Sequence, residues 1–201
     1  MRLVDGRRLR ILDFDIENRP LSYWVPDCPT AEITAIASCW ADDEGSMEVL
    51  LLGDMDGDEI LRRFLVRYNE ADMVTGHYIR KHDLPIINGS LMEFGLPLLS
   101  PKLSCDTKLD MMKKADLPAT QEFLIETLGV PIPKVHMSQA DWREANRLTP
   151  EGLRKTRARV AGDVYGHMLL RLAMVERGML RSPSVWKPGG GVAADSARHA
   201  R

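Results

Sequence analysis

Hydrophobic and acidic side chains alternate near the start of the chain, over residues 11–17, in the order Ile-Leu-Asp-Phe-Asp-Ile-Glu. Successive side chains of a strand point to opposite faces, so the apolar residues would enter a core while Asp13, Asp15 and Glu17 line the other face. Three carboxylates this close repel one another unless a cation neutralises them, and Mg²⁺ and Mn²⁺ prefer oxygen ligands. A solvated strand face is the alternative interpretation of this segment by itself.

The hydrophobic pattern that follows predicts two more strands, then a helix. Residues 33–40 and 47–52 read as strands joined by the turn-rich segment 41–46, which together with the first strand would form an antiparallel meander. Apolar residues recur at helical spacing over residues 58–69, and residues 73–78 read as a short strand. A strand, a helix and a strand in succession indicate a parallel crossover.

The second half of the chain predicts mostly helices. We expect helices near residues 84–94 and 120–128, with a short strand at about 103–106 between them. A long helix is expected to begin after Thr149, which is followed by proline, and to run to about Arg177. The predicted fold is therefore a ribonuclease H-like mixed five-stranded sheet, in which a three-strand antiparallel meander is followed by parallel strands, flanked by helices. Several other α/β folds fit this order almost as well.

Two further carboxylates fall where such a fold can bring them to the first strand. Asp83 follows the fourth predicted strand, and Asp163 lies inside the long helix. Asp163 is only ~60° around the helix from the apolar stripe expected to face the sheet. An acid at a core boundary is costly unless it is paired or binds a metal. The residues of that expected stripe are Val160, Val164, Met168, Leu172 and Val175.

These motifs resemble the DEDD superfamily of 3′–5′ exonucleases, which includes the proofreading exonuclease domains of DNA polymerases. The resemblance rests on Asp15-x-Glu17, on Val74-x-Gly-His77 running into His82-Asp83-Leu84-Pro85, and on Asp163-Val164. It extends from Leu12 to about Met174, and it is greatest to the branch of the superfamily that carries a tyrosine before the last aspartate.

The resemblance implies a site and a reaction. Asp15, Glu17, Asp83 and Asp163 would hold two Mg²⁺ or Mn²⁺ ions on either side of a phosphate. One ion would activate a water, and the other would stabilise the leaving 3′-oxygen. The implied enzyme is a 3′–5′ exonuclease that acts on single-stranded DNA or frayed 3′ ends in replication, repair or recombination.

The sequence departs from the superfamily at the general base. The tyrosine or histidine expected four or five residues before Asp163 is replaced by Arg159 and Ala158. Arg159 can pair with Asp163 or hold the substrate phosphate, but a guanidinium does not deprotonate water near neutral pH. His167, one helical turn beyond Asp163, is the candidate reserve base, and a structural role is the alternative for it.

Candidate substrate contacts lie in the loop before Asp83 and in a later connector. His77, Tyr78 and His82 would border the substrate, with Tyr78 where relatives carry asparagine and His82 where they carry phenylalanine. Tyr78 and His82 are the candidates for stacking on a terminal base. Lys134 lies in a proline-rich segment that either grips the strand backbone or is simply a packed connector.

Composition limits the remaining possibilities. A chain of 201 residues with 44% hydrophobic content is expected to form one domain over residues 1–186, followed by a disordered Gly-rich tail at 187–201. That tail is a candidate contact for a replication or repair protein. The net charge of −2 argues against indiscriminate coating of nucleic acid. Three widely spaced cysteines, no apolar leader and no membrane span predict a cytoplasmic protein.

Two other functions compete with the DNA exonuclease. The first is a nucleic-acid-binding or interaction module with weakened catalysis, for which Arg159 is the argument. The second is a 3′–5′ exoribonuclease, which differs only in its tolerance of the 2′-hydroxyl. The retained acidic quartet favours an enzyme.

Overall fold

The computed structural model describes residues 8–20, 31–112, 119–132 and 135–189. Lys134 and residues 190–201, which include most of the predicted tail, lie outside the described residues, as does Cys28. The two cysteines inside them, Cys39 and Cys105, are buried free thiols. None of the helices in the described ranges combines the length and apolar character that a membrane crossing needs.

A six-stranded mixed sheet forms the centre of the molecule, in the order β3-β2-β1-β4-β5-β6. β1, β2 and β3 form the predicted antiparallel meander, and β4 and β5 extend it in parallel from β1. The strands are β1 Ile11–Pro20, β2 Ala31–Trp40, β3 Asp43–Leu51, β4 Met73–Gly76, β5 Lys102–Asp106 and β6 Ser184–Trp186. This is the mixed sheet expected for a ribonuclease H-like fold.

The predicted strand count of five was wrong by one. β6 runs antiparallel to β5, pairing Trp186 with Lys102, and forms the far edge of the sheet. It has only three residues, and a run that short carries no detectable two-residue periodicity.

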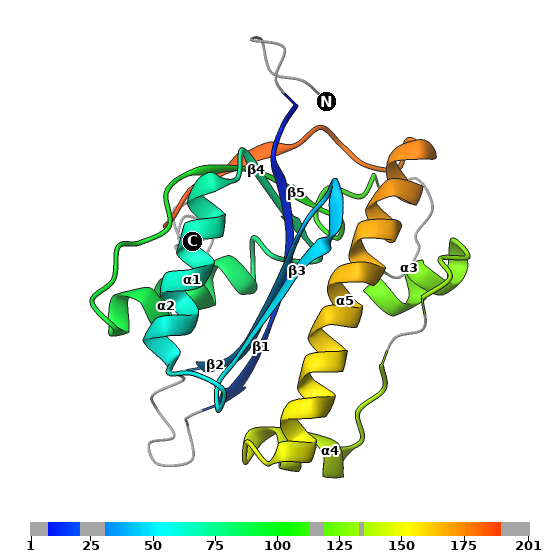
Figure 1. Ribbon diagram of the computed structural model, residues 1–201. Helices are drawn as coiled ribbons and strands as arrows, with labels where there is room; N and C mark the ends of the chain where they lie inside the picture. The colour runs from blue at the N-terminus through cyan, green and yellow to red at the C-terminus, as the bar shows by residue number, and fades with distance from the viewer. Residues whose placement is uncertain (1–7, 21–30, 113–118, 133–134, 190–201) are drawn as a thin grey trace, which may run out of the picture.

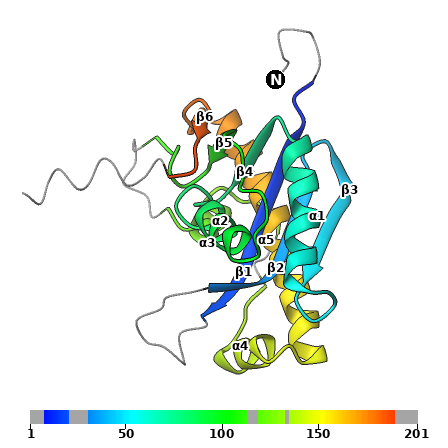
Figure 2. The ribbon, with the colours of Figure 1, turned by 90° about the vertical axis from the view of Figure 1, so that its left-hand side faces the viewer.

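Helices cover both faces of the sheet (Figures 1 and 2). α1 (Gly57–Glu70) and α2 (Asp83–Glu93) pack on one face, and the long α5 (Pro150–Glu176) packs on the other. α3 (Gln121–Thr127) and α4 (Gln139–Asn146) contact α5. α4 was not predicted, although Ser138 and Asp141 form a capping box at its start, which is a recognisable sequence signal.

The alternation along β1 divides its side chains between these two layers. Leu12, Phe14 and Ile16 enter the core cluster shared with α1 and α2. The intervening acids therefore face α5, on the side where a second cluster joins β2 to Val160 and Val164. The sequence pattern thus predicted correctly which side chains of β1 enter the hydrophobic core and which lie on the other face, although Asp13 on that other face is also fully buried.

α5 begins as predicted, because the Thr149 side chain accepts a hydrogen bond of 3.1 Å from the Gly152 backbone N–H. Its inward face is different from the predicted stripe beyond Met168. Leu172 and Val175 are 51% and 57% exposed, whereas Arg171 is buried. At 100° per residue Leu172 lies ~120° around the helix from Val160, but Arg171 lies only ~20° from it.

Candidate metal centre

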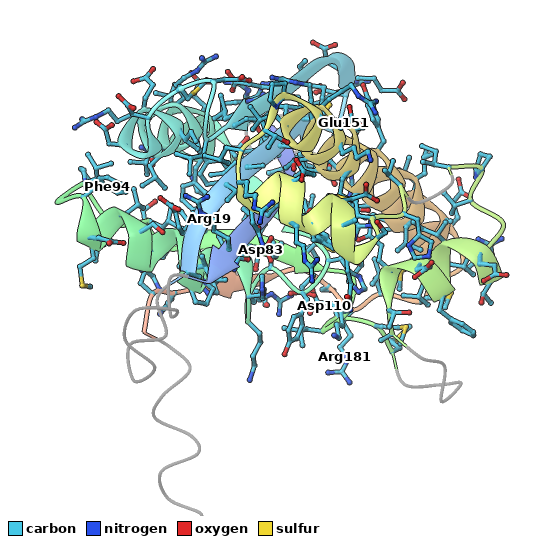
Figure 3. All side chains as sticks on the ribbon, turned by 90° about the horizontal axis from the view of Figure 1, so that it is seen from below. Arg19, Asp83, Phe94, Asp110, Glu151 and Arg181 are labelled. Carbon is cyan, nitrogen blue, oxygen red and sulfur yellow. The ribbon has the colours of Figure 1, made fainter. Side chains whose placement is uncertain are left out.

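A small pocket of about 190 Å³ brings the predicted acids together beside the middle of β1. All of its lining residues except Ile16 and Gln121 were predicted as site residues. Figure 3 views the molecule from below, with Asp83 labelled near the centre at the start of α2. The lining residues are Asp15, Ile16, Glu17, His77, Tyr78, His82, Asp83, Gln121, Arg159 and Asp163.

The first strand supplies two of the carboxylates, Asp15 and Glu17, on the face that α5 covers. The pairing of β1 with β2 shifts register between Glu17 and Asn18, which is a bulge at the edge of the site. The Thr34 hydroxyl donates a 3.1 Å hydrogen bond to the Glu17 backbone carbonyl at this irregularity. The bulge bends β1 next to Glu17, at the edge of the pocket.

The long helix supplies Asp163, which is 6% exposed. The side-chain amide of Gln121, on α3, donates a 2.8 Å hydrogen bond to the Asp163 backbone carbonyl. Sequence reasoning missed Gln121, because a single glutamine that follows a helix cap belongs to no motif. Its contact holds α3 against the turn of α5 that carries the acid.

Three of the acids suit a hard divalent cation. Asp15, Glu17 and Asp163 each offer one carboxylate oxygen, and these oxygens lie within 4.8 Å of one another. Oxygen-only donors from separate elements are what Mg²⁺ and Mn²⁺ bind. The donor set is therefore compatible with a hard divalent cation, and the choice of Mg²⁺ or Mn²⁺ stays a prediction.

Asp83 lines the same pocket from the first turn of α2 and is 3% exposed. Burial raises the pKa of its carboxyl above the ordinary value, and the neighbouring His82 opposes that shift. The His82 Nδ1 lies 3.4 Å from Asp83 Oδ2, and this contact raises the pKa of the His82 imidazole. His82 itself is exposed at the rim.

Arg159 reaches into the acidic cluster from α5. Its Nε lies 2.9 Å from Asp163 Oδ2 and 3.4 Å from Glu17 Oε1. Its Nη1 donates a 2.6 Å hydrogen bond to the Val135 backbone carbonyl. The pairing with Asp163 expected from the sequence is confirmed, and the guanidinium also contacts Glu17.

His167 does not line the pocket. It is buried beside Asp13, with its Nδ1 2.9 Å from Asp13 Oδ1. Arg171 binds the same carboxylate through two hydrogen bonds of 3.2 and 3.0 Å. This placement favours the structural role for His167 over that of reserve base. The buried Arg171 was not predicted, although its place on the inward face of α5 follows from helical geometry.

The loop that carries Tyr78 is shaped by the backbone on both sides. A side chain at Gly76 would lie 2.8 Å from the Phe14 carbonyl and 2.2 Å from Ile79, so glycine is needed there. The buried Asp106 carboxylate accepts backbone hydrogen bonds from Tyr78 at 3.0 Å and Arg80 at 3.1 Å. Asp106 therefore stabilises this turn from the end of β5.

Tyr78 is held in an unusual backbone conformation for its residue type. Its φ of 72° lies in the left-handed region, which asparagine tolerates better than tyrosine. The Lys108 Nζ lies 4.0 Å from the centre of the Tyr78 ring, a cation–π contact. Such strain at a pocket wall is typical of functional loops.

His77 is anchored through both ring nitrogens. Nε2 donates a 3.0 Å hydrogen bond to the Ala119 carbonyl, and Nδ1 lies 2.9 Å from the Thr107 hydroxyl. Burial, followed by the nearby His167, lowers the pKa of His77 to about 4. The imidazole of His77 is therefore neutral near pH 7, and it lines the pocket without adding a positive charge for a phosphate.

Comparison with known proteins identifies the architecture. No protein-family profile and no curated protein matches the chain. Among solved structures, the fold is similar to that of the family B DNA polymerase from the hyperthermophilic archaeon Pyrobaculum calidifontis, with a TM-score of 0.63 and 20% sequence identity. The match covers 85% of this chain and 25% of that chain, so the chain spans about a quarter of the polymerase's length. At this identity the likeness shows the fold alone, and it is consistent with a ribonuclease H-like fold.

Proposed function

We propose that the chain is a divalent-metal-dependent 3′–5′ exonuclease acting on single-stranded DNA or frayed 3′ ends, in replication, repair or recombination. The observation that carries this proposal is the convergence of Asp15, Glu17 and Asp163, with Asp83 on the same pocket wall. The fold neighbour, a DNA polymerase, supports a nucleic-acid-related role. We also propose a cytoplasmic location, where the buried thiols of Cys39 and Cys105 would stay reduced.

The proposed chemistry needs ions that the carboxylates would hold. Two Mg²⁺ or Mn²⁺ ions bound there would lower the pKa of the attacking water and neutralise charge on the phosphate and the leaving oxygen. Asp15 and Glu17 from β1 and Asp163 from α5 would hold and orient these ions. Asp83 would add a fourth carboxylate to balance their positive charge. Tyr78 and His82 at the rim would border the terminal nucleotide.

A second pocket, of about 730 Å³, includes residues of the same loop as the acidic one. Arg80 and Lys81, which lie between Tyr78 and His82 in the sequence, line it together with Lys187. Lys81 and Lys187 are exposed, which suits a phosphate backbone. We propose that the strand leads from this pocket to the acidic site.

A time course on a 5′-labelled single-stranded oligonucleotide tests the proposal. We expect a ladder that shortens from the 3′ end with Mg²⁺ or Mn²⁺, that disappears with EDTA, and that is lost in Asp15→Asn. A parallel RNA substrate separates the exonuclease from an exoribonuclease. If neither substrate is shortened at high enzyme concentration, the proposed activity is wrong.

A second candidate is a nucleic-acid-binding module with weakened catalysis. The observation that favours it is Arg159, whose guanidinium contacts two of the acids where an active relative would carry its base. Oligonucleotide binding without cleavage, unaffected by Asp15→Asn, would favour this function.

A further inference from the structure

Arg159 contacts two of the acids that could hold a metal ion. Its Nε contacts both Asp163 Oδ2 and Glu17 Oε1, at 2.9 and 3.4 Å. These two residues are also two of the three whose oxygens converge for a cation. The side chains of all three partners are largely shielded, with Arg159 and Glu17 each 16% exposed and Asp163 7%. A divalent ion and the guanidinium would therefore compete for the same two carboxylates.

The shielding makes this competition strong. Attraction between opposite charges, and repulsion between like charges, grow as water is excluded from the space between them. A second cation cannot approach Glu17 and Asp163 closely while the guanidinium remains there. The Nη1 bond to the Val135 carbonyl keeps Arg159 in place when the pocket holds no ion.

We propose that Arg159 is an internal counter-ion of the acidic site, which a divalent cation must displace before it can bind Glu17 and Asp163. This inference rests on the proposed function. A displaced guanidinium would remain at the pocket edge, where it can donate two hydrogen bonds to the two non-bridging oxygens of a phosphodiester. Nucleic acid would therefore draw Arg159 off the acids and strengthen metal binding.

The coupling must act in both directions. If an oligonucleotide raises the affinity for the metal, the metal raises the affinity for the oligonucleotide by the same factor. The site would then fill with metal chiefly when a strand is present, so that Arg159 restricts hydrolysis to the bound 3′ end.

Mn²⁺ binding to the full-length chain, measured by titration calorimetry without nucleic acid, tests the competition. We expect Arg159→Gln to bind Mn²⁺ on the order of tenfold more tightly than the wild type or better, because one positive charge has left the site. Arg159→Lys, which keeps the charge, should stay within a few-fold of wild type. Affinity in Arg159→Gln equal to or weaker than wild type would overturn the proposal.

Arg157→Gln is the matched control. Arg157 lies on the same helix, is half-exposed, and pairs with Asp54 outside the pocket. Its loss should leave Mn²⁺ affinity unchanged. An equal gain in both variants would show a general effect of net charge and would contradict a specific role for Arg159.

Thermal unfolding covers the case in which Arg159→Gln folds poorly. Removing the counter-ion increases the repulsion among the carboxylates, so this variant should be less stable than wild type without metal and should gain more from Mn²⁺. An unfolded variant that excess Mn²⁺ does not rescue would contradict the proposal. These readouts do not depend on cleavage, so a chain that cuts no substrate could still show the competition, and an active nuclease could lack it.

Discussion

β1 carries two acidic centres on the same face, one at Asp13 and one at Asp15 and Glu17. An arginine from α5 contacts Asp13 in the first and Glu17 in the second. Asp13 is fully buried and binds Arg171 through two hydrogen bonds, with His167 at 2.9 Å. Asp15 lines a pocket that Arg159 enters. The strand alternation is the same in both, but the surroundings of each acid differ.

The two centres differ in the balance between their acidic and basic side chains. Asp13 is one carboxylate against an arginine and a histidine, and the cluster is closed to solvent. Among the described residues, four carboxylates and one arginine line the pocket, with His82 at the rim. An excess of carboxylate oxygens facing a pocket favours a divalent ion, whereas a paired acid in the interior stabilises one arrangement of strand and helix.

The largest expected difference is in catalysis, between Asp15→Asn and Asp13→Asn. Asp15→Asn should lower the cleavage rate about 10⁴-fold, or ~5 kcal/mol in the barrier, with little change in stability. Asp13→Asn should instead lower stability and leave the activity of the folded fraction within about tenfold. Initial rates and urea unfolding on both variants measure this. A stable, inactive Asp13→Asn would place Asp13 in the reaction.

The next effect tests whether the Asp13 centre is structural. Arg171→Met removes the buried partner and should lower the free energy of unfolding by about 3–5 kcal/mol, because Asp13 is left without its guanidinium. The double variant Arg171→Met with Asp13→Leu should lose less than this single variant. Urea unfolding checks both. A double variant less stable than either single variant would show that the pair contributes more than charge balance.

Sequence reasoning predicted the pocket better than the buried centre. Asp15, Glu17 and Asp163 belong to motifs with fixed spacing, and strand and helix periodicity placed them on facing surfaces. Asp13 has the same periodicity but no motif, and its partner Arg171 is separated from it by most of the chain. Only the packing of α5 on β1 shows that Arg171 reaches it.

The fold was predictable where periodicity is long, and less so elsewhere. The meander and the 27-residue α5 follow from sustained patterns. The three-residue β6 and Gln121 do not, because their positions depend on contacts with β5 and α5 rather than on local sequence. The predicted apolar stripe of α5 continued a four-residue repeat beyond Met168. At 100° per residue such a repeat drifts away from the inward face of the helix, so this part of the prediction was wrong.

The stability of the protein should depend on pH through His77, which lines the pocket and is influenced by His167 of the Asp13 centre. His77 lines the pocket, and burial together with His167 lowers its pKa to about 4 from the ordinary 6.5. Because the unfolded chain takes up this proton first, stability should fall as pH drops from about 6.5 to about 4, by at most ~3 kcal/mol from this group. Urea unfolding of wild type and His77→Gln across this range isolates the effect. An identical pH dependence in both would show that His77 is not responsible.

The smallest expected effect concerns the strained rim residue of the pocket. Tyr78→Asn suits the positive φ of 72° but removes the ring, so stability should change by less than ~1 kcal/mol. If the ring stacks on the terminal base, affinity for a single-stranded oligonucleotide should fall by about 1–2 kcal/mol, roughly tenfold. Fluorescence anisotropy in EDTA measures binding without cleavage, and Tyr78→Phe should bind as wild type does. Unchanged affinity in Tyr78→Asn would mean that the ring does not stack on the terminal base, and that the strained backbone serves only to turn the chain toward Asp83.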